Sequence, residues 1–435
     1  MKTKCLLINP WVCDFSALNL WSRPLGLLRV AEYLSRYDVE LSFIDCTDVY
    51  GNRRRFGTGK YPRRIIEKPE VLKQVPKNFA RYGMSVNEFK DKLKKNLPCD
   101  IVFVTSIMSY WYPGVQQAIE IVKSMSPRTP VILGGIYATL YQSHAQENSG
   151  ADHIFTGHIQ EDIEEISEKF GCPLTGKKDP LPYYKLGLYR DMPFAPILTS
   201  AGCPYNCSYC ASSVLNDRFV QQEPSVVINE IKELYGAGVR DFAFYDDALL
   251  VNAASHMKVI LRGVIESGMK VRFHCPNGIH ARFIDDELAG LMYKSGFMTL
   301  RISLETVNRE RQLNTGGKIT SDVFRSTIGN LKMQGFTKEQ IGVYLMYGLP
   351  GQSLDEVDES VNFLKSLGVR INLNEFSPIP GTKNWDELIS RGIITRDIDP
   401  LLTNNSVFAY LYSGYEADAI EKLKLDVKEY NSLGG

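Results

Sequence analysis

Short apolar or β-branched runs alternate with amphipathic, helix-length segments along nearly the whole chain, and this alternation limits the folds that the chain can adopt. Repeated strand and helix segments are typical of βα units, which build parallel sheets. At 435 residues the chain is longer than one hydrophobic core usually organises. We therefore expect an α/β protein with two domains.

The first half of the chain contains five expected strands. They are Cys5–Asn9, Val39–Asp45, Ile101–Ser106, Val131–Gly135 and His153–Thr156, with helices expected at Leu25–Arg36, Val115–Ser124 and Asp162–Phe170. This pattern predicts a doubly wound, Rossmann-like parallel sheet over residues 1–170, interrupted by an insertion at 51–98. Such sheets bind ligands outside the carboxyl ends of their strands, so the loops after Asn9, Ser106 and Leu133 are candidate binding positions.

A second series of strands follows an expected linker at residues 171–193, where four prolines (Pro173, Pro180, Pro182 and Pro193) interrupt every periodic pattern. The expected strands are Pro196–Ser200, Asp241–Tyr245, Val271–His274, Thr299–Leu304, Gly342–Tyr347 and Asn372–Phe376. Six βα units predict a partial (β/α)6 barrel over residues 194–385, followed by a helical extension at 386–435. The active site of a parallel barrel lies at the C-terminal ends of its strands.

The composition is that of an ordinary globular protein, with 44% hydrophobic and 23% charged residues. Fifty Lys and Arg residues balance fifty Asp and Glu residues, so no global charge indicates a partner. The apolar stretch near the N-terminus is too short for a signal peptide or a membrane span. Without a secretory signal, nine cysteines indicate reduced thiols in the cytoplasm rather than disulfides.

Three of these cysteines, Cys203, Cys207 and Cys210, are spaced four and then three residues apart directly after an expected strand. Soft thiolates select iron-sulfur clusters or zinc. Three ligands leave one iron of a four-iron cluster open, and the amine and carboxylate of a substrate could chelate it. The alternatives are a zinc site completed by a distant residue and three unrelated thiols in a loop.

This spacing, with the aromatic residue Tyr209 before the last cysteine, resembles the signature of the radical S-adenosylmethionine (SAM) superfamily. The resemblance implies a [4Fe-4S] cluster on the three cysteines. It also implies SAM contacts at the ends of the later strands, by Tyr209 and by Tyr245, Asp246, Asp247, Ser303, Glu305 and Gly348. It names no catalytic acid or base, because the task of the protein is to position the substrate against a 5′-deoxyadenosyl radical.

The first domain resembles the cobalamin-binding domain that precedes many radical SAM enzymes. The resemblance depends on a strand that ends in paired glycines, Gly134 and Gly135, together with Asn9 at the first strand end, Thr105 and Ser106 at the third, and the barrel that follows. It implies cobalamin contacts by Asn9, Ser106, Gly134, Gly135 and Tyr137. The chain has no Asp-x-His-x-x-Gly loop to supply a histidine below the cobalt. This leaves two possibilities, cobalamin bound without a histidine or a domain that has lost the cofactor.

With cobalamin, the resemblance implies methyl transfer to an unactivated carbon, driven by electrons from a low-potential donor such as flavodoxin or ferredoxin. Alternatives are a cobalamin-independent oxidation, cyclisation or rearrangement, and an iron-sulfur protein without catalysis. A methylthiotransferase would need a second cluster. Cys13 and Cys46 are suitably placed for one, but no third thiol follows the strand that ends at Ser106.

The insertion at 51–98 is strongly basic. Between Asn52 and Asn96 there are 14 Lys or Arg residues and 4 Asp or Glu residues. Arg53–Arg55, Lys60, Arg63 and Arg64, interleaved with Phe56 and Tyr61, could bind an anionic substrate or partner, although a solvated surface is the commoner explanation. The tyrosine-rich segment 401–433 would either cover the barrel mouth or pack outside it.

Overall fold

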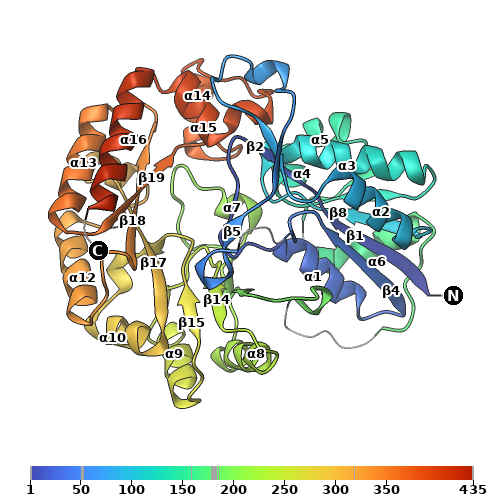
Figure 1. Ribbon diagram of the computed structural model, residues 1–435, viewed down its shortest axis with the longest axis horizontal. Helices are drawn as coiled ribbons and strands as arrows, with labels where there is room; N and C mark the ends of the chain where they lie inside the picture. The colour runs from blue at the N-terminus through green and yellow to red at the C-terminus, as the bar shows by residue number, and fades with distance from the viewer. Residues whose placement is uncertain are drawn as a thin grey trace. The chain divides into compact units, whose positions relative to one another are not determined.

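The computed structural model describes residues 2–49, 53–157, 159–177, 184, 186–317 and 319–433. The chain divides into two compact units (Figure 1). The first comprises Met1–Asp191 with Asp397–Asn404, and the second comprises Met192–Arg396 with Asn405–Gly435. Pro180 and Pro182 of the expected linker lie outside the described residues.

The first unit contains a five-stranded parallel sheet in the order β10-β9-β8-β1-β4. Its strands are β1 (Thr3–Asn9), β4 (Val39–Asp45), β8 (Ile101–Val104), β9 (Val131–Leu133) and β10 (His153–Ile154). Its helices are α1 (Leu25–Leu34), α2 (Val86–Asn96), α3 (Tyr112–Met125), α4 (Ile136–Leu140), α5 (Gln142–Asn148) and α6 (Ile159–Lys169). The expected doubly wound sheet is confirmed, and its strand order reverses between β1 and β8, where such sheets bind ligands.

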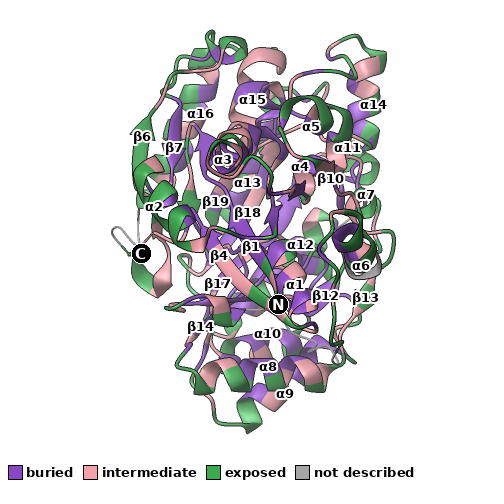
Figure 2. Cartoon of the chain, turned by 90° about the vertical axis from the view of Figure 1, so that its right-hand side faces the viewer, coloured by how far each residue is buried: buried purple, intermediate pink, exposed green. Residues whose placement is uncertain are grey.

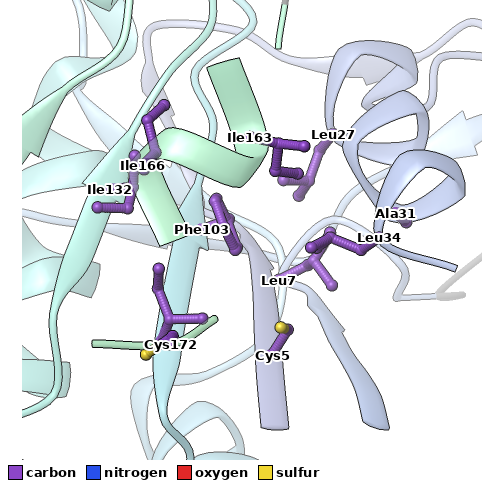
Figure 3. Packing of buried hydrophobic residues seen from close by; sticks show 11 residues of the cluster. Cys5, Leu7, Leu27, Ala31, Leu34, Phe103, Ile132, Ile163, Ile166 and Cys172 are labelled. Atoms are coloured by element: carbon purple, nitrogen blue, oxygen red, sulfur yellow. The ribbon is translucent and has the colours of Figure 1, made fainter. Parts of the chain in front are cut away.

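The core on one face of this sheet is made by side chains from three of its strands and two helices (Figure 3). Leu7, Phe103 and Ile132 come from β1, β8 and β9. They pack against the apolar stripes of α1 (Leu27, Ala31, Leu34) and α6 (Ile163, Ile166). Each of these side chains is at most 5% exposed. The 3.6-residue period of both helices therefore fixes which of their faces meets the sheet.

Strands of the insertion pair with residues 12–19 in small antiparallel sheets that the sequence pattern did not indicate. One has the order β2-β7-β6, with strands Val12–Asp14, Ala80–Tyr82 and Arg63–Ile65, and the other pairs β3 (Leu18–Asn19) with β5 (Gly59–Lys60). β6 is exposed along its whole length (Figure 2). The basic residues are thus in different settings: Arg63 and Arg64 are exposed, whereas Arg81 is buried and donates to Gln117 Oε1 at 3.0 Å.

The second unit contains a parallel sheet in the order β11-β14-β15-β17-β18-β19, with β16 also paired to β17. The strands are β11 (Ala195–Ile197), β14 (Asp241–Phe244), β15 (Arg272–His274), β16 (Ile279–His280), β17 (Phe297–Glu305), β18 (Ile341–Tyr347) and β19 (Arg370–Glu375). All six expected strands are present and form the expected partial barrel, although several of their ends differ. The two-residue β16 was not expected.

Helices alternate with these strands along the chain. They are α7 (Ser212–Leu215), α8 (Pro224–Gly236), α9 (Met257–Glu266), α10 (Asp286–Ser295), α11 (Arg309–Asn314), α12 (Ser321–Met333), α13 (Leu354–Ser366), α14 (Lys383–Ser390), α15 (Asn405–Tyr412) and α16 (Ala417–Ser432). Side-chain caps set several helix starts: Asp285, Thr320 and Ser353 each accept a hydrogen bond from a backbone N–H in the first turn. Such caps satisfy N–H groups that have no partner within the helix.

The C-terminal helix α16 packs against β19 and α13 (Figure 1). Asn431 bonds to both backbone groups of Ile371, at 3.0 and 2.8 Å, and Lys365 pairs with Asp426 at 2.6 Å. The helix therefore covers the last strand of the partial barrel. Within the described part of the chain, no helix is both long enough and apolar enough to cross a membrane.

Candidate active site

The three cysteines lie in a loop that begins after the first strand of the partial barrel. Strand β12 (Ser200–Ala201) pairs with β13 (Val220–Gln221) and leads into the loop at Gly202. Gly202 has φ 74°, and a Cβ there would lie 2.2 Å from the carbonyl oxygen of Arg218. Only glycine suits this position, because a side chain would collide with backbone. Cys207 is buried, and Cys203 and Cys210 are partly buried.

Two distant segments hold this loop in place. The backbone N–H of Asn384, in the first turn of α14, donates to the carbonyl oxygen of Ser208 at 2.8 Å. Gly316, with φ 127°, lies against Cys207, and a Cβ there would be 2.8 Å from the Cys207 sulfur. Sequence reasoning missed both residues. The paired glycines at 316 and 317 were a possible signal, whereas nothing in the local sequence marks Asn384.

The donor set suits an iron-sulfur cluster. Three thiols within eight residues of one loop are soft ligands without a competing carboxylate among them. No three His, Cys, Asp or Glu side chains among the described residues are arranged to hold one metal ion. That finding concerns a single-ion site, since each cysteine of a four-iron cluster binds a different iron atom.

Asp246, which follows β14, ties the segment before the loop to the barrel. Its Oδ1 accepts hydrogen bonds from the Thr199 N–H (2.9 Å), the Thr199 hydroxyl (2.7 Å) and the Ser200 hydroxyl (2.6 Å). Burial raises the pKa of Asp246 to about 6. Its Oδ2 is buried without a hydrogen-bond partner. A buried oxygen of this kind is costly unless a ligand or water satisfies it.

The neighbouring carboxylate, Asp247, accepts a hydrogen bond from the Ser212 hydroxyl at 2.6 Å. Burial raises its pKa as well. Both carboxylates are therefore engaged with the segments that flank the cysteine loop.

Glu305 ends β17 in a strained backbone conformation. Its φ is 67°, in the left-handed region, and the pairing of β17 with β18 shifts register between Ser303 and Glu305. The side chain is 7% exposed and accepts a hydrogen bond from the Tyr209 hydroxyl at 3.2 Å. The structure thus brings together two of the predicted SAM contacts, one from the cysteine loop and one from a strand end. Strain of this kind is concentrated at functional sites.

The remaining predicted SAM contacts also follow strand ends. The carbonyl oxygen of Tyr245, after β14, accepts from the Asn277 side chain at 2.9 Å. Ser303 is buried on β17, and Gly348, with φ 84°, follows β18. Since the carboxyl ends of parallel strands share one edge of a sheet, these residues lie along the edge from which the cysteine loop also departs.

In the first unit, a cavity of about 210 Å³ lies at the carboxyl ends of β8, β9 and β10. Gly134 and Gly135 line it, together with Gly26, Thr105 and Phe155. Gly135 has φ 91°, and a Cβ there would lie 2.6 Å from the Ser106 carbonyl oxygen. Glycine at this position therefore lets the chain after β9 approach the chain after β8 closely. The close approach of a ligand stays a prediction.

The other predicted cobalamin contacts form internal hydrogen bonds and are not among the residues that line this cavity. Asn9 donates to Asp45 Oδ1 at 2.7 Å, and the Ser106 hydroxyl donates to the Met108 carbonyl at 2.7 Å. The Tyr137 hydroxyl shares a 2.7 Å hydrogen bond with His144 Nδ1. The structure therefore groups the two glycines around the cavity and leaves these three side chains engaged elsewhere.

Residues 197–364 match the Radical SAM superfamily. The matched segment holds the three cysteines, Asp246 and Glu305, so the site just described lies in a radical SAM domain, which follows an N-terminal parallel α/β sheet along the chain.

Two solved structures share this arrangement. The radical SAM methyltransferase TsrM from Kitasatospora setae, with tryptophan and a SAM analogue bound, has a TM-score of 0.64 at 16% identity, covering 90% of this chain and 76% of TsrM. The cobalamin-dependent radical SAM enzyme OxsB has a TM-score of 0.59 at 12% identity, covering 98% of this chain and 61% of OxsB. At these identities the likeness concerns the fold.

Among curated proteins, an uncharacterized methyltransferase of Pyrococcus horikoshii is 23% identical over 340 residues, which are 70% of this chain and 72% of the relative. The sequence likeness thus extends beyond the segment that matches the superfamily.

Proposed function

We propose that the protein is a cobalamin-dependent radical SAM methyltransferase that methylates an unactivated carbon. The glycine-lined cavity at the carboxyl edge of the first sheet carries the proposal, because it provides a built recess where a doubly wound sheet binds its ligand. The likeness to TsrM, which has been solved with cobalamin and a [4Fe-4S] cluster bound, supports it.

The residues present fit both cofactors. Cys203, Cys207 and Cys210 would hold the cluster, and Gly134 and Gly135 would allow part of the cobalamin to approach the backbone closely. When bound, the cluster and SAM supply a carbon-centred radical, and cobalamin supplies the transferred methyl group. The chain itself contributes positioning and exclusion of water rather than acid-base catalysis.

Each predicted SAM contact has a defined task in this proposal. The Asp246 Oδ2, which is buried and has no hydrogen-bond partner, would accept a hydrogen bond from bound ligand or water. Glu305, aligned by the Tyr209 hydroxyl, would accept from a ribose hydroxyl or from the methionyl amine. Because Tyr209 belongs to the cysteine loop, this contact would couple the position of SAM to that of the cluster.

The methylthiotransferase alternative draws support from relatives with that name, one of which is 24% identical over 253 residues. It would need three thiols for a second cluster. Cys13 and Cys46 are buried, and no third cysteine follows the strand that ends near Ser106. This function therefore has less support than methyl transfer.

Reduction of the cluster requires an electron donor of low potential, and we propose a flavodoxin or ferredoxin. We place the protein in a reducing compartment such as the cytoplasm. The thiols that would hold the cluster must stay reduced to act as ligands.

The fate of SAM tests the proposal without knowledge of the substrate. The anaerobically reconstituted, reduced enzyme should form 5′-deoxyadenosine from SAM, and it should form S-adenosylhomocysteine only when cobalamin has been supplied. Mass spectrometry quantifies both products. Formation of 5′-deoxyadenosine with no cobalamin-dependent S-adenosylhomocysteine would instead establish a cobalamin-independent radical enzyme.

A further inference from the structure

The inner face of the partial barrel carries an arginine whose charge the fold does not balance. On β17, Leu300, Ile302 and Leu304 are at most 2% exposed and belong to the apolar side of the strand. Arg301 and Ser303 alternate with them and point to the opposite side, because successive strand residues face opposite ways. Arg301 pairs in register with Gly342 of β18, and Ser303 pairs with Tyr344.

The Arg301 guanidinium is partly buried and lacks an acidic partner. Its Nη1 donates to the carbonyl oxygen of Leu300 at 2.9 Å. Within the described residues, no carboxylate lies within 4.0 Å of it. Burial lowers the pKa of Arg301; Tyr344 opposes this effect, and the neighbouring charge of Arg370 adds to it. Burying a charge without a counter-charge is costly. A ligand that carries the opposite charge would remove this cost when it binds.

Asn372, on the adjacent strand β19, provides the second observation. Its Oδ1 is buried and has no hydrogen-bond partner. It and the Arg301 guanidinium extend over the same glycine: a Cβ on Gly342 would lie 2.7 Å from Arg301 Nη1 and 2.8 Å from Asn372 Oδ1. A cation without an acidic partner and an unsatisfied amide oxygen therefore lie close together on the inner face, over Gly342, where a side chain would displace them.

We propose that Arg301 binds a carboxylate of the substrate and that Asn372 accepts a hydrogen bond from a donor beside that carboxylate. The planar guanidinium can bind a carboxylate through two parallel hydrogen bonds. The substrate class is thus an organic acid with an adjacent N–H or O–H group. This inference deepens the proposed function. That the bound acid is the methyl acceptor rests on the proposed function.

Direct binding of a simple probe tests the site. Calorimetry on the anaerobically reconstituted protein without SAM should detect mandelate, which has a carboxylate and a neighbouring hydroxyl. Mandelamide, which has the same shape without the charge, should bind at least about tenfold more weakly, since one charged contact contributes about 1.4 kcal/mol or more. Arg301→Gln should weaken mandelate binding by a similar factor.

A second variant supplies the missing carboxylate from the protein. Asn372→Asp should pair internally with Arg301, which would prevent mandelate binding and raise the unfolding midpoint. Two matched controls should bind mandelate normally: Arg370→Gln removes an exposed neighbouring positive charge, and Asn374→Asp places a carboxylate one inner-face position further along β19.

The inference would be overturned if the unaltered protein did not bind mandelate, or if it bound mandelate and mandelamide equally. It would also be overturned if Arg301→Gln bound mandelate with unchanged affinity, or if this variant lost affinity for SAM while it still bound mandelate. Inorganic phosphate that binds through Arg301 where mandelate does not would also reject a carboxylate. None of these measurements requires cobalamin. A failure of methyl transfer is therefore distinguishable from a failure of this site.

Discussion

The two parallel sheets present chemically different carboxyl edges. At the edge in the second unit, thiols, buried carboxylates and a strained glutamate gather around one loop. At the edge in the first unit, a cavity is lined partly by glycines, and nearby polar side chains such as Asn9 bond to other protein groups. The first kind of edge offers specific functional groups to a ligand. The second offers shape and backbone, which suits a large cofactor with its own chemistry.

The largest expected effect is the loss of the cluster at one edge with cobalamin binding retained at the other. Cys207→Ser should abolish cluster assembly and SAM cleavage, because a hydroxyl does not replace a soft thiolate ligand. The cavity of the first unit does not involve this residue, so cobalamin binding should remain. Iron, sulfide and cobalt analysis measures both effects. Cys172→Ser, which alters a buried thiol of the first unit, is the control and should retain iron.

Adding a methyl group at the glycine-lined edge should destabilise the protein at Gly135 and leave its stability nearly unchanged at Gly134. Gly135→Ala combines an unfavourable φ with a collision against the Ser106 backbone and should cost about 2–4 kcal/mol of unfolding free energy. A Cβ on Gly134 would meet nothing closer than 3.8 Å, so Gly134→Ala should have little effect on stability. Urea unfolding and cobalt content compare the pair. Equal behaviour of the two variants would contradict the account.

The charged edge should make the stability of the protein depend on pH. The folded pKa of Asp246, about 6, exceeds its ordinary value of 3.8, so the folded state binds the extra proton between these values. Stability contributed by this group should therefore fall as pH rises from about 4 to about 6, by about 3 kcal/mol. Asp246→Asn should reduce this slope in unfolding experiments on the metal-free protein, and Asp247, whose pKa burial also raises, should leave a slope of the same sign. An unchanged slope would show that another group titrates.

The smallest expected effect concerns backbone strain at Glu305. Glu305→Gly should relieve the left-handed conformation and raise stability by about 1 kcal/mol, while it weakens SAM binding. Glu305→Gln retains the strain and removes only the charge, so it should weaken SAM binding without the gain in stability. Thermal unfolding and equilibrium binding of SAM distinguish these effects. A Gly variant no more stable than the Gln variant would show that the strain is negligible.

The sequence located most of the strands, because buried parallel strands are continuous apolar runs between turn residues. It did not predict the order of the strands in either sheet. It missed β16 and the small antiparallel sheets, because their strands mix polar with apolar residues and form no continuous apolar run. The cysteine spacing alone indicated the cluster loop. The contacts of Asn384 with Ser208 and of Gly316 with Cys207 join segments more than 100 residues apart, and no local pattern reports them.

Cofactor content of the purified protein tests the central claim most directly. After anaerobic reconstitution with iron, sulfide and hydroxocobalamin, and removal of unbound cofactor, iron and cobalt are measured together with the visible spectrum. The account predicts about four iron atoms and about one cobalt per chain, with the cobalt lost in Gly135→Ala and kept in Cys207→Ser. Iron without cobalt would contradict the cobalamin-dependent function and leave the first sheet as a binding domain for another ligand.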